Sequence, residues 1–207
     1  MKIQWWLTIG LVLTGSLAWA QGRVMGGTVM NHMDKLLPVK DYSVTMLMDA
    51  GGQTISTKTF KLGKKMRVEI AQQGFQMVTL LDPDADDGKG AAYVLMPMMK
   101  TYMKQPAPPA ATAPADNVDI QTEELGKEDV DGVPCDKRRV TITDNGTTYT
   151  ITLWASPKDK DMPVKMEMAE PNKVIIRYKD YDFTKPAADL FTLPADYKAG
   201  DFGGMAR

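Results

Sequence analysis

The sequence predicts an α+β protein that is mostly β, with one large antiparallel sheet of about ten strands and a single helix near the N-terminus. Three observations predict this class. Apolar residues recur with a period of two along most of the chain from residue 40 onward, as they do in half-buried strands. Only one stretch, before residue 38, has helical spacing. Asn145-Gly146, between two alternating runs, marks a tight hairpin.

The first 20 residues have the pattern of a secretory signal peptide. Lys2 precedes an uncharged, largely apolar run that closes on Ala18-Trp19-Ala20, a triplet that signal peptidase accepts. We therefore expect cleavage after Ala20, a periplasmic location and one mature domain, residues 21–207. The alternative is an uncleaved anchor, for which the run is short and is interrupted by polar residues and glycines.

Residues 25–36 carry the helical pattern, because Met25, Val29, Met33 and Leu36 recur at i, i+4, i+8 and i+11. Pro38 ends this segment. Alternating runs follow, separated by turn residues, and each predicts a strand. The runs are residues 42–48, 55–62, 66–70, 77–81, 93–96, 98–104, 118–125, 135–143, 147–154, 164–168 and 174–183.

Residues 105–117 interrupt the strand pattern. Four prolines and five alanines without an apolar period form neither a central strand nor a stable helix. We expect an extended or mobile loop inside the single domain, since strands flank it on both sides.

Composition bounds the chemistry. The formal net charge is −1, which argues against a nucleic-acid partner. A Ser-His-Asp or Cys-His site would have to use His32, the single histidine, so we expect no enzymatic activity, no catalytic residues and no cofactor. Cys135 is the single cysteine, which leaves two interpretations: a small apolar residue in or beside a strand, or a reactive or intermolecular thiol.

The chain is rich in methionine, with 16 residues, several of them paired at i, i+2. That spacing places both side chains on one sheet face, where methionine fills irregular apolar space. Three interpretations stay open: structural packing, an adaptable lining for a lipid or a partner, and binding of Cu(I) by thioether sulfur. The candidate lining residues are Met46, Met48, Met66, Met77, Met103, Trp154, Met166 and Met168.

The acidic stretch and the basic clusters of the sequence each have a structural and a functional interpretation. Asp82–Gly88 resembles the start of a calcium loop, but its glycine is one place late and Tyr93 stands where the last ligand should be, so we expect a solvated acidic turn. The basic clusters at 58–67 and 137–139 are expected on the wet face of strands. Contact with anionic lipid headgroups is the alternative.

Four short stretches, in this order, resemble the periplasmic lipoprotein-carrier superfamily, the LolA/LolB-like group. They are residues 124–139, Thr152-Leu153-Trp154, residues 162–165 and residues 191–194. The resemblance covers roughly residues 24–197 and is closest to a branch known only as a domain of unknown function. It implies a half-barrel of about eleven antiparallel strands whose concave apolar face, covered by helices, holds acyl chains or lipoproteins. Lid helices are not visible midway through the sheet, and segment 105–117 stands near that place.

The sequence therefore predicts a non-enzymatic, monomeric periplasmic protein that binds a lipid, a lipoprotein or another apolar ligand on a concave sheet face. Methionine-rich alternating strands, which would supply an adaptable apolar surface, motivate this hypothesis. The second hypothesis is an envelope protein–protein interaction or stress-sensing module that binds through its edges and loops. A methionine-based Cu(I) binder is the third.

Overall fold

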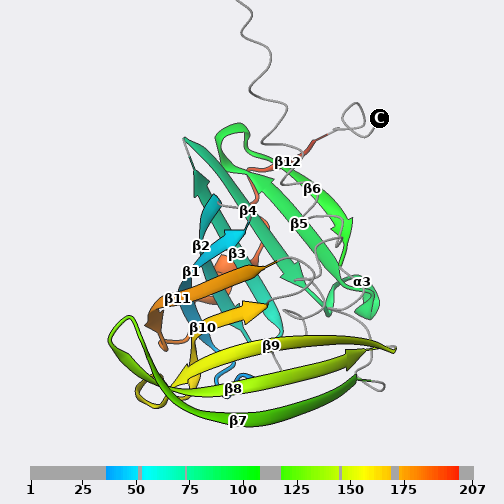
Figure 1. Ribbon diagram of the computed structural model, residues 1–207. Helices are drawn as coiled ribbons and strands as arrows, with labels where there is room; N and C mark the ends of the chain where they lie inside the picture. The colour runs from blue at the N-terminus through cyan, green and yellow to red at the C-terminus, as the bar shows by residue number, and fades with distance from the viewer. Residues whose placement is uncertain are drawn as a thin grey trace, which may run out of the picture.

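The computed structural model describes residues 36–50, 53–72, 74–107, 118–144, 146–168 and 173–200. Twelve strands form one long open sheet, and the described residues contain little helix (Figure 1). The predicted class, mostly β with a single large sheet, is confirmed. Of the predicted N-terminal helix only Leu36 is described, and the loop prediction for 105–117 falls on residues that are for the most part outside the described chain.

The strands agree closely with the alternating runs of the sequence. They are β1 (Tyr42–Ala50), β2 (Gln53–Leu62), β3 (Lys65–Gln72), β4 (Phe75–Asp82), β5 (Ala91–Met96), β6 (Thr101–Pro106), β7 (Val118–Val130), β8 (Val133–Asp144), β9 (Thr147–Ser156), β10 (Met162–Met168), β11 (Val174–Asp182) and β12 (Lys198–Ala199). Short helical turns lie between some of them: α3 (Ala85–Gly88), η1 (Pro97–Met99), η2 (Pro157–Asp159) and η3 (Ala188–Phe191).

Two antiparallel meanders build the sheet and meet at its centre. β1 to β6 follow one another toward one edge, while β7 starts at the other edge and β8 to β11 lead back until β11 pairs with β1. β7 to β9 run across the direction of β4 to β6, so the sheet is strongly twisted (Figure 1). β12 pairs with β6 in parallel, and this two-residue strand makes the sheet mixed rather than purely antiparallel as predicted.

The boundaries differ from the prediction where local backbone chemistry overrides alternation. Residues 98–104 were expected in a strand, but Pro97 begins the 3₁₀ turn η1 and Lys100 ends it with φ of 50°. β7 continues past the expected end at residue 125 because a bulge between Glu124 and Gly126 absorbs one extra residue. Gly126 has φ of 96°, which suits glycine far better than any side chain.

The larger hydrophobic core lies on one face of the sheet, here called the core face. Its buried members come from β1 and from β8 to β11, with Met162 at the start of β10. Outside these strands, Leu36, Leu37 and Val39 pack against it. These residues stand at or just after the end of the predicted amphipathic segment. Their contacts place this end of the segment on the core face.

A smaller core lies on the opposite face, over β4 and β5. Val78, Leu80 and Leu95 are buried there, and Leu193 and Tyr197 pack against them. Residues 183–200, here called the C-terminal segment, reach this face through η3 and end in β12 beside β6. Arg67 on β3 donates a hydrogen bond of 2.9 Å to the Leu190 carbonyl oxygen and so holds the segment to the sheet.

Replacing Ile151 by alanine should lower the free energy of unfolding by about 2–5 kcal/mol, because the truncation leaves a cavity among well-packed neighbours. Ile151 is 1% exposed on the core face. Urea denaturation measures the change. Thr150→Ser, at the exposed neighbouring position on the opposite face, should change stability by less than about 1 kcal/mol. Equal losses in the two variants would contradict this assignment of faces.

Candidate functional site

Seven of the eight candidate lining residues share the core face. Strand register establishes this, because residues directly opposite each other in a ladder point to the same side. Met46 and Met48 oppose Tyr178 and Ile176 of β11, and Ile176 also opposes Met166 of β10. Two residues further along β10, Met168 lies on the same side as Met166.

The same register carries the core face across to β6. One row of directly paired residues runs through Val44, Thr59, Val68, Thr79, Val94 and Met103. A second row joins Met46 to Thr57, Ile70 and Met77. Met66 lies on this face as well, opposite Lys61 and Leu81. The methionines therefore form a surface that extends over both meanders.

Burial divides the core face into two parts. Over β1 and β8 to β11 its apolar side chains are mostly buried in the larger core. Over β2 to β6 the apolar side chains other than the buried Ala92 are half-buried and pack against none of the three buried clusters that the described chain forms. These nine residues, here called the half-buried area, are Ile55, Met66, Val68, Ile70, Met77, Leu81, Val94, Met96 and Met103.

Three of the four side chains that the structure describes on the core face of β2 are polar, and all three are buried. Thr59 lies 3.3 Å from the Met46 sulfur through its hydroxyl oxygen, which donates the hydrogen bond. Thr57 and Lys61 are buried beside it. The half-buried area is therefore bounded along β2 by the buried side chains of Thr57, Thr59 and Lys61, and beyond them lies the packed part of the face.

Trp154 lies on the opposite face, apart from the seven methionines. It is 4% exposed and packs with Val130 and Cys135 in a separate cluster. The Lys165 and Lys137 ammonium nitrogens stand 4.1 and 5.1 Å from its ring centroid, an arrangement of cation–π contacts. Its ring N–H makes no hydrogen bond of ordinary geometry within the described residues, although the indole helps Lys137 to lower the pKa of the Glu128 carboxyl.

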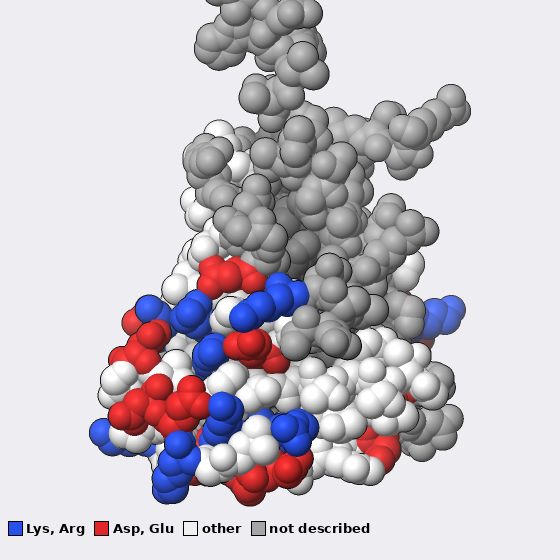
Figure 2. All heavy atoms as spheres, in the orientation of Figure 1, with Lys and Arg blue, Asp and Glu red and all other residues white. Residues whose placement is uncertain are grey.

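The basic cluster on β8 is neutralised by ion pairs with β7. On β8, Lys137, Arg138 and Arg139 pair with Glu128, Glu124 and Glu123 of β7 at 2.6–2.8 Å. Charged side chains of both signs alternate over the part of the surface where β7 to β11 lie (Figure 2). The arrangement is that of a solvated strand face, because exposed pairs of opposite sign leave little net field for an anionic surface.

The acidic turn at 82–88 is also neutralised. Lys65, Lys64 and Lys104 pair with Asp82, Asp84 and Asp86 respectively at 2.7–2.9 Å. Within the part of the chain that the structure describes, no group of three or more His, Cys, Asp and Glu side chains could hold a metal ion.

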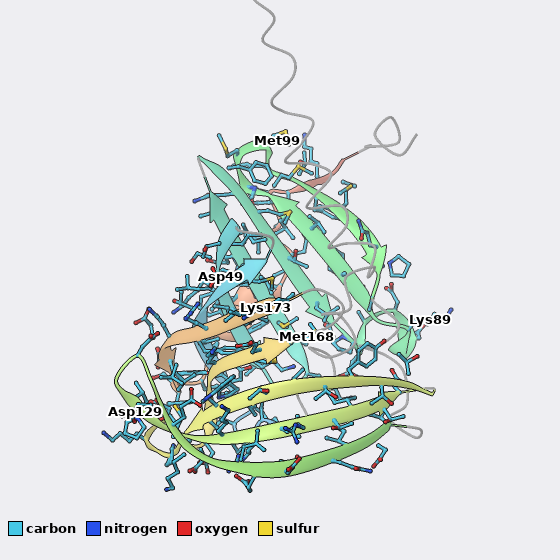
Figure 3. All side chains as sticks on the ribbon, viewed as in Figure 1. Asp49, Lys89, Met99, Asp129, Met168 and Lys173 are labelled. Carbon is cyan, nitrogen blue, oxygen red and sulfur yellow. The ribbon has the colours of Figure 1, made fainter. Side chains whose placement is uncertain are left out.

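The methionine-rich stretch at 96–103 is split between two places. Met96 and Met103 belong to the core face, whereas Met98 and Met99 are 74% and 56% exposed on η1. Met99 stands at one end of the sheet, far from Met168 (Figure 3). The stretch is therefore not one compact group of thioethers.

A cavity of about 270 Å³ lies between the C-terminal segment and the opposite face of β3 to β5. Its lining residues are Arg67, Glu69, Ile70, Ala71, Gln76, Met77, Val78, Leu95, Pro97, Pro194 and Tyr197. Met77 is the only candidate lining residue that also borders it. Sequence analysis missed this site because Arg67 belonged to a basic cluster and Tyr197 lies 130 residues away along the chain. Alternation alone could have placed Arg67 and Glu69 on the face opposite Met66.

Cys135 is buried on the opposite face, in the cluster with Trp154. Its thiol donates a hydrogen bond of 3.3 Å to the Val133 carbonyl oxygen. Burial raises the pKa of this thiol above its ordinary value. Of the two interpretations left open by the sequence, the surroundings favour the small apolar residue, since a reactive thiol needs exposure and a lowered pKa.

With this geometry in place, comparison with known proteins supplies the family. A family model described as Domain of unknown function (DUF4412) matches residues 43–162, more than half of the chain. The chain belongs to the DUF4412 family. The predicted assignment to a branch known only as a domain of unknown function is confirmed. No sequence among curated proteins matches this DUF4412 protein.

Solved structures show the fold that this DUF4412 protein shares with others. An uncharacterized conserved protein from Thermus thermophilus superposes with a TM-score of 0.51 at 11% identity, covering 84% of this chain and 97% of the other. The Mycobacterium tuberculosis lipoprotein LppX has a TM-score of 0.43 at 10% identity, covering 77% and 94%. The Pseudomonas aeruginosa MucA/MucB complex gives 0.38 at 16%, covering 75% and 56%. The last two TM-scores are too low to bear on fold or function.

The Cys135 thiol of this DUF4412 protein should react with an alkylating reagent far more slowly in the folded than in the urea-unfolded protein. Because the pKa is raised in the folded state, folding favours the protonated thiol. Its contribution to stability is present below the unfolded pKa of about 8.5 and is lost as pH rises above it. Cys135→Ala should remove this alkaline loss, measured by urea denaturation on either side of that pH. Equal alkylation rates in the two states would contradict the burial.

Proposed function

We propose that this DUF4412 protein is a non-enzymatic periplasmic protein that binds a lipid, a lipoprotein or another apolar ligand on the core face of its sheet. The observation that carries the proposal is the half-buried area, nine apolar side chains on one side of β2 to β6 that pack against none of the buried clusters of the described chain. When a ligand removes apolar surface of this kind from water, the free energy of the system falls, and this favours binding.

The residue types suit an acyl chain better than a rigid ligand. Met66, Met77 and Met103 belong to the area, and methionine side chains have three rotatable bonds and a polarizable sulfur. They can therefore repack around chains of different length and bend. Valine, isoleucine and leucine supply the rest of the surface, and no charged side chain belongs to it.

We further propose that the sheet is a half-barrel with the core face on its concave side. β6 and β7 lie near opposite edges of the sheet, yet only residues 107–117 join them. A short connection between distant edges favours a sheet curved so that those edges approach each other. The resemblance to the lipoprotein carriers implies the same shape. In this arrangement Trp154, on the opposite face, does not line the ligand site.

We propose the periplasm as the location and residues 1–20 as a cleaved signal peptide. The charged residue, apolar run and Ala-x-Ala triplet support this. Among the described residues no helix has the length and apolar character needed to cross a bilayer. The protein that remains would be a single domain of residues 21–207.

Protein purified from the periplasm should carry bound lipid, seen by native mass spectrometry as adducts of lipid mass, and should bind a fluorescent fatty acid after delipidation. The reason is that an acyl chain that covers the half-buried area removes apolar surface from water, which is favourable. A preparation that is free of lipid and also fails to bind the fatty acid would refute the proposal.

Two matched variants localise the binding. Met103→Asp, within the half-buried area, should weaken fatty-acid binding at least about tenfold, since a carboxylate desolvated against an acyl chain costs more than about 1.4 kcal/mol. Ser56→Asp adds the same charge at an exposed position of β2 on the opposite face and should leave the affinity unchanged. Equal effects would place the ligand elsewhere.

The intact mass of the periplasmic protein should correspond to a chain that begins at Gln21, because signal peptidase cuts after the second alanine of the triplet. Ala20→Pro should block this cut and leave the full-length chain in the membrane fraction. Finding the full-length mass for the unaltered protein in the soluble periplasmic fraction would contradict the assignment.

A further inference from the structure

We infer that the cavity beneath the C-terminal segment is a docking site for an extended, uncharged segment of a partner protein that inserts one large apolar side chain. The cavity lies mainly against the face opposite the half-buried area, with which it shares only Ile70 and Met77, and the inference does not require a lipid to occupy that area. It gives the envelope-interaction hypothesis a defined surface.

The size and lining of the cavity suit a single anchoring side chain. Its volume is about 270 Å³, below the range of roughly 300–1,000 Å³ usual for sites that enclose a drug-sized molecule. Val78, Leu95, Pro97 and Pro194 form the apolar part of its lining, beside the polar side chains of Arg67, Glu69 and Gln76. Protein interfaces commonly derive most of their binding energy from one or a few large side chains that fill such pockets.

Exposed apolar side chains stand at the same end of the sheet. The large hydrophobic residues that the described chain leaves exposed are Phe75, Met98 and Met99. Met98 directly follows Pro97, which lines the cavity, whereas Phe75 is on the core face by strand register, next to the lining residue Gln76. Met99 lies at the end of the sheet in Figure 3. An apolar patch beside a pocket with polar members is typical of a surface that another macromolecule covers.

The polar groups of the cavity suit a peptide backbone. Arg67 donates through Nε to Glu69 at 2.6 Å and through Nη1 to the Leu190 carbonyl oxygen. The remaining guanidinium N–H groups and the second carboxylate oxygen of Glu69 have no partner in the described chain. The pair therefore offers donors and an acceptor side by side, as a peptide N–H and C=O require.

Charge favours a protein segment over a lipid surface. Arg67 and Glu69 compensate each other, and Lys100 at the end of η1 is paired with Asp196 at 2.8 Å. An anionic membrane would instead be recognised by several cations in excess. The partner should accordingly be a segment without net charge that presents leucine, phenylalanine or another large apolar residue.

A selection from random displayed peptides tests the inference on the folded protein. Peptides are selected for binding to the unaltered chain alone, and each enriched peptide is then tested on Ala71→Trp, whose indole would fill the cavity from an exposed lining position. Thr150→Trp, an exposed position on β9 far from the cavity, is the matched control. We expect enriched peptides to share one large apolar residue and no net charge, and to bind the control variant normally.

Binding of an enriched peptide is then followed by amide chemical shifts. We expect the shifts in residues 67–78 and 194–197. Ala71→Trp should lose at least about 90% of the affinity, corresponding to about 1.4 kcal/mol. The double variant Met98→Ser, Met99→Ser, which alters only exposed positions, should also bind more weakly.

Enrichment of no peptide, shifts confined to the core face, or binding retained by Ala71→Trp would overturn the inference. So would a surface that binds anionic phosphatidylglycerol vesicles in place of peptide and loses that binding in the Met98→Ser, Met99→Ser variant. Fatty-acid binding by Ala71→Trp keeps this test separate from that of the lipid site.

Discussion

The pairing of β11 with β1 is the constraint on which the rest of the sheet depends, because it joins two meanders that are otherwise complete. Arg177 and Asp49, on neighbouring positions of this ladder, form an ion pair of 2.6 Å on the opposite face. The junction leaves nine strands between β6 and β7. In a flat sheet β6 and β7 would stand about 48 Å apart. A fully extended chain from Pro106 to Val118 reaches only about 43 Å. The sheet must therefore curve or coil, and its two faces cannot be equivalent.

That inequivalence separates the two sites. Side chains alternate between the faces along each strand, so the residues that build the half-buried area and those that build the cavity interleave on β3 and β4. Met66 and Val68 point to one side, and Arg67 and Glu69 to the other. The C-terminal segment covers only the second side, where Leu193 and Tyr197 complete a small core. A single pair of strands thus supports two surfaces of different chemistry, and only Ile70 and Met77, paired at one end of the ladder, border both.

Most of the sheet could be predicted from the sequence, because alternation is a local property of each strand. Residues 42–48 and 174–183 alternate clearly, and both are strands. Met46 and Met48, and likewise Met166 and Met168, are spaced by two residues, which is why each pair falls on one face. Trp154 falls on the other face because it directly follows Leu153, which pairs with Met166 on the core face, whereas Trp154 pairs with Lys165. β12 and the cavity could not be predicted, since both depend on where the C-terminal segment returns, and a two-residue parallel strand has no alternation to detect.

The structural and the binding interpretations of the methionines apply to different parts of the core face. Met46, Met162, Met166 and Met168 are each at most 9% exposed within the larger core, where a flexible side chain fills space between β1 and β10. Met66, Met77 and Met103 lie beyond the row of buried threonines on β2 and remain half-buried. Packing explains the first group completely, because their neighbours already enclose them. The second group packs against none of the buried clusters of the described chain. An adaptable apolar surface continuous with a rigid core is what an acyl chain would need: a fixed floor on one side and side chains free to close around it on the other.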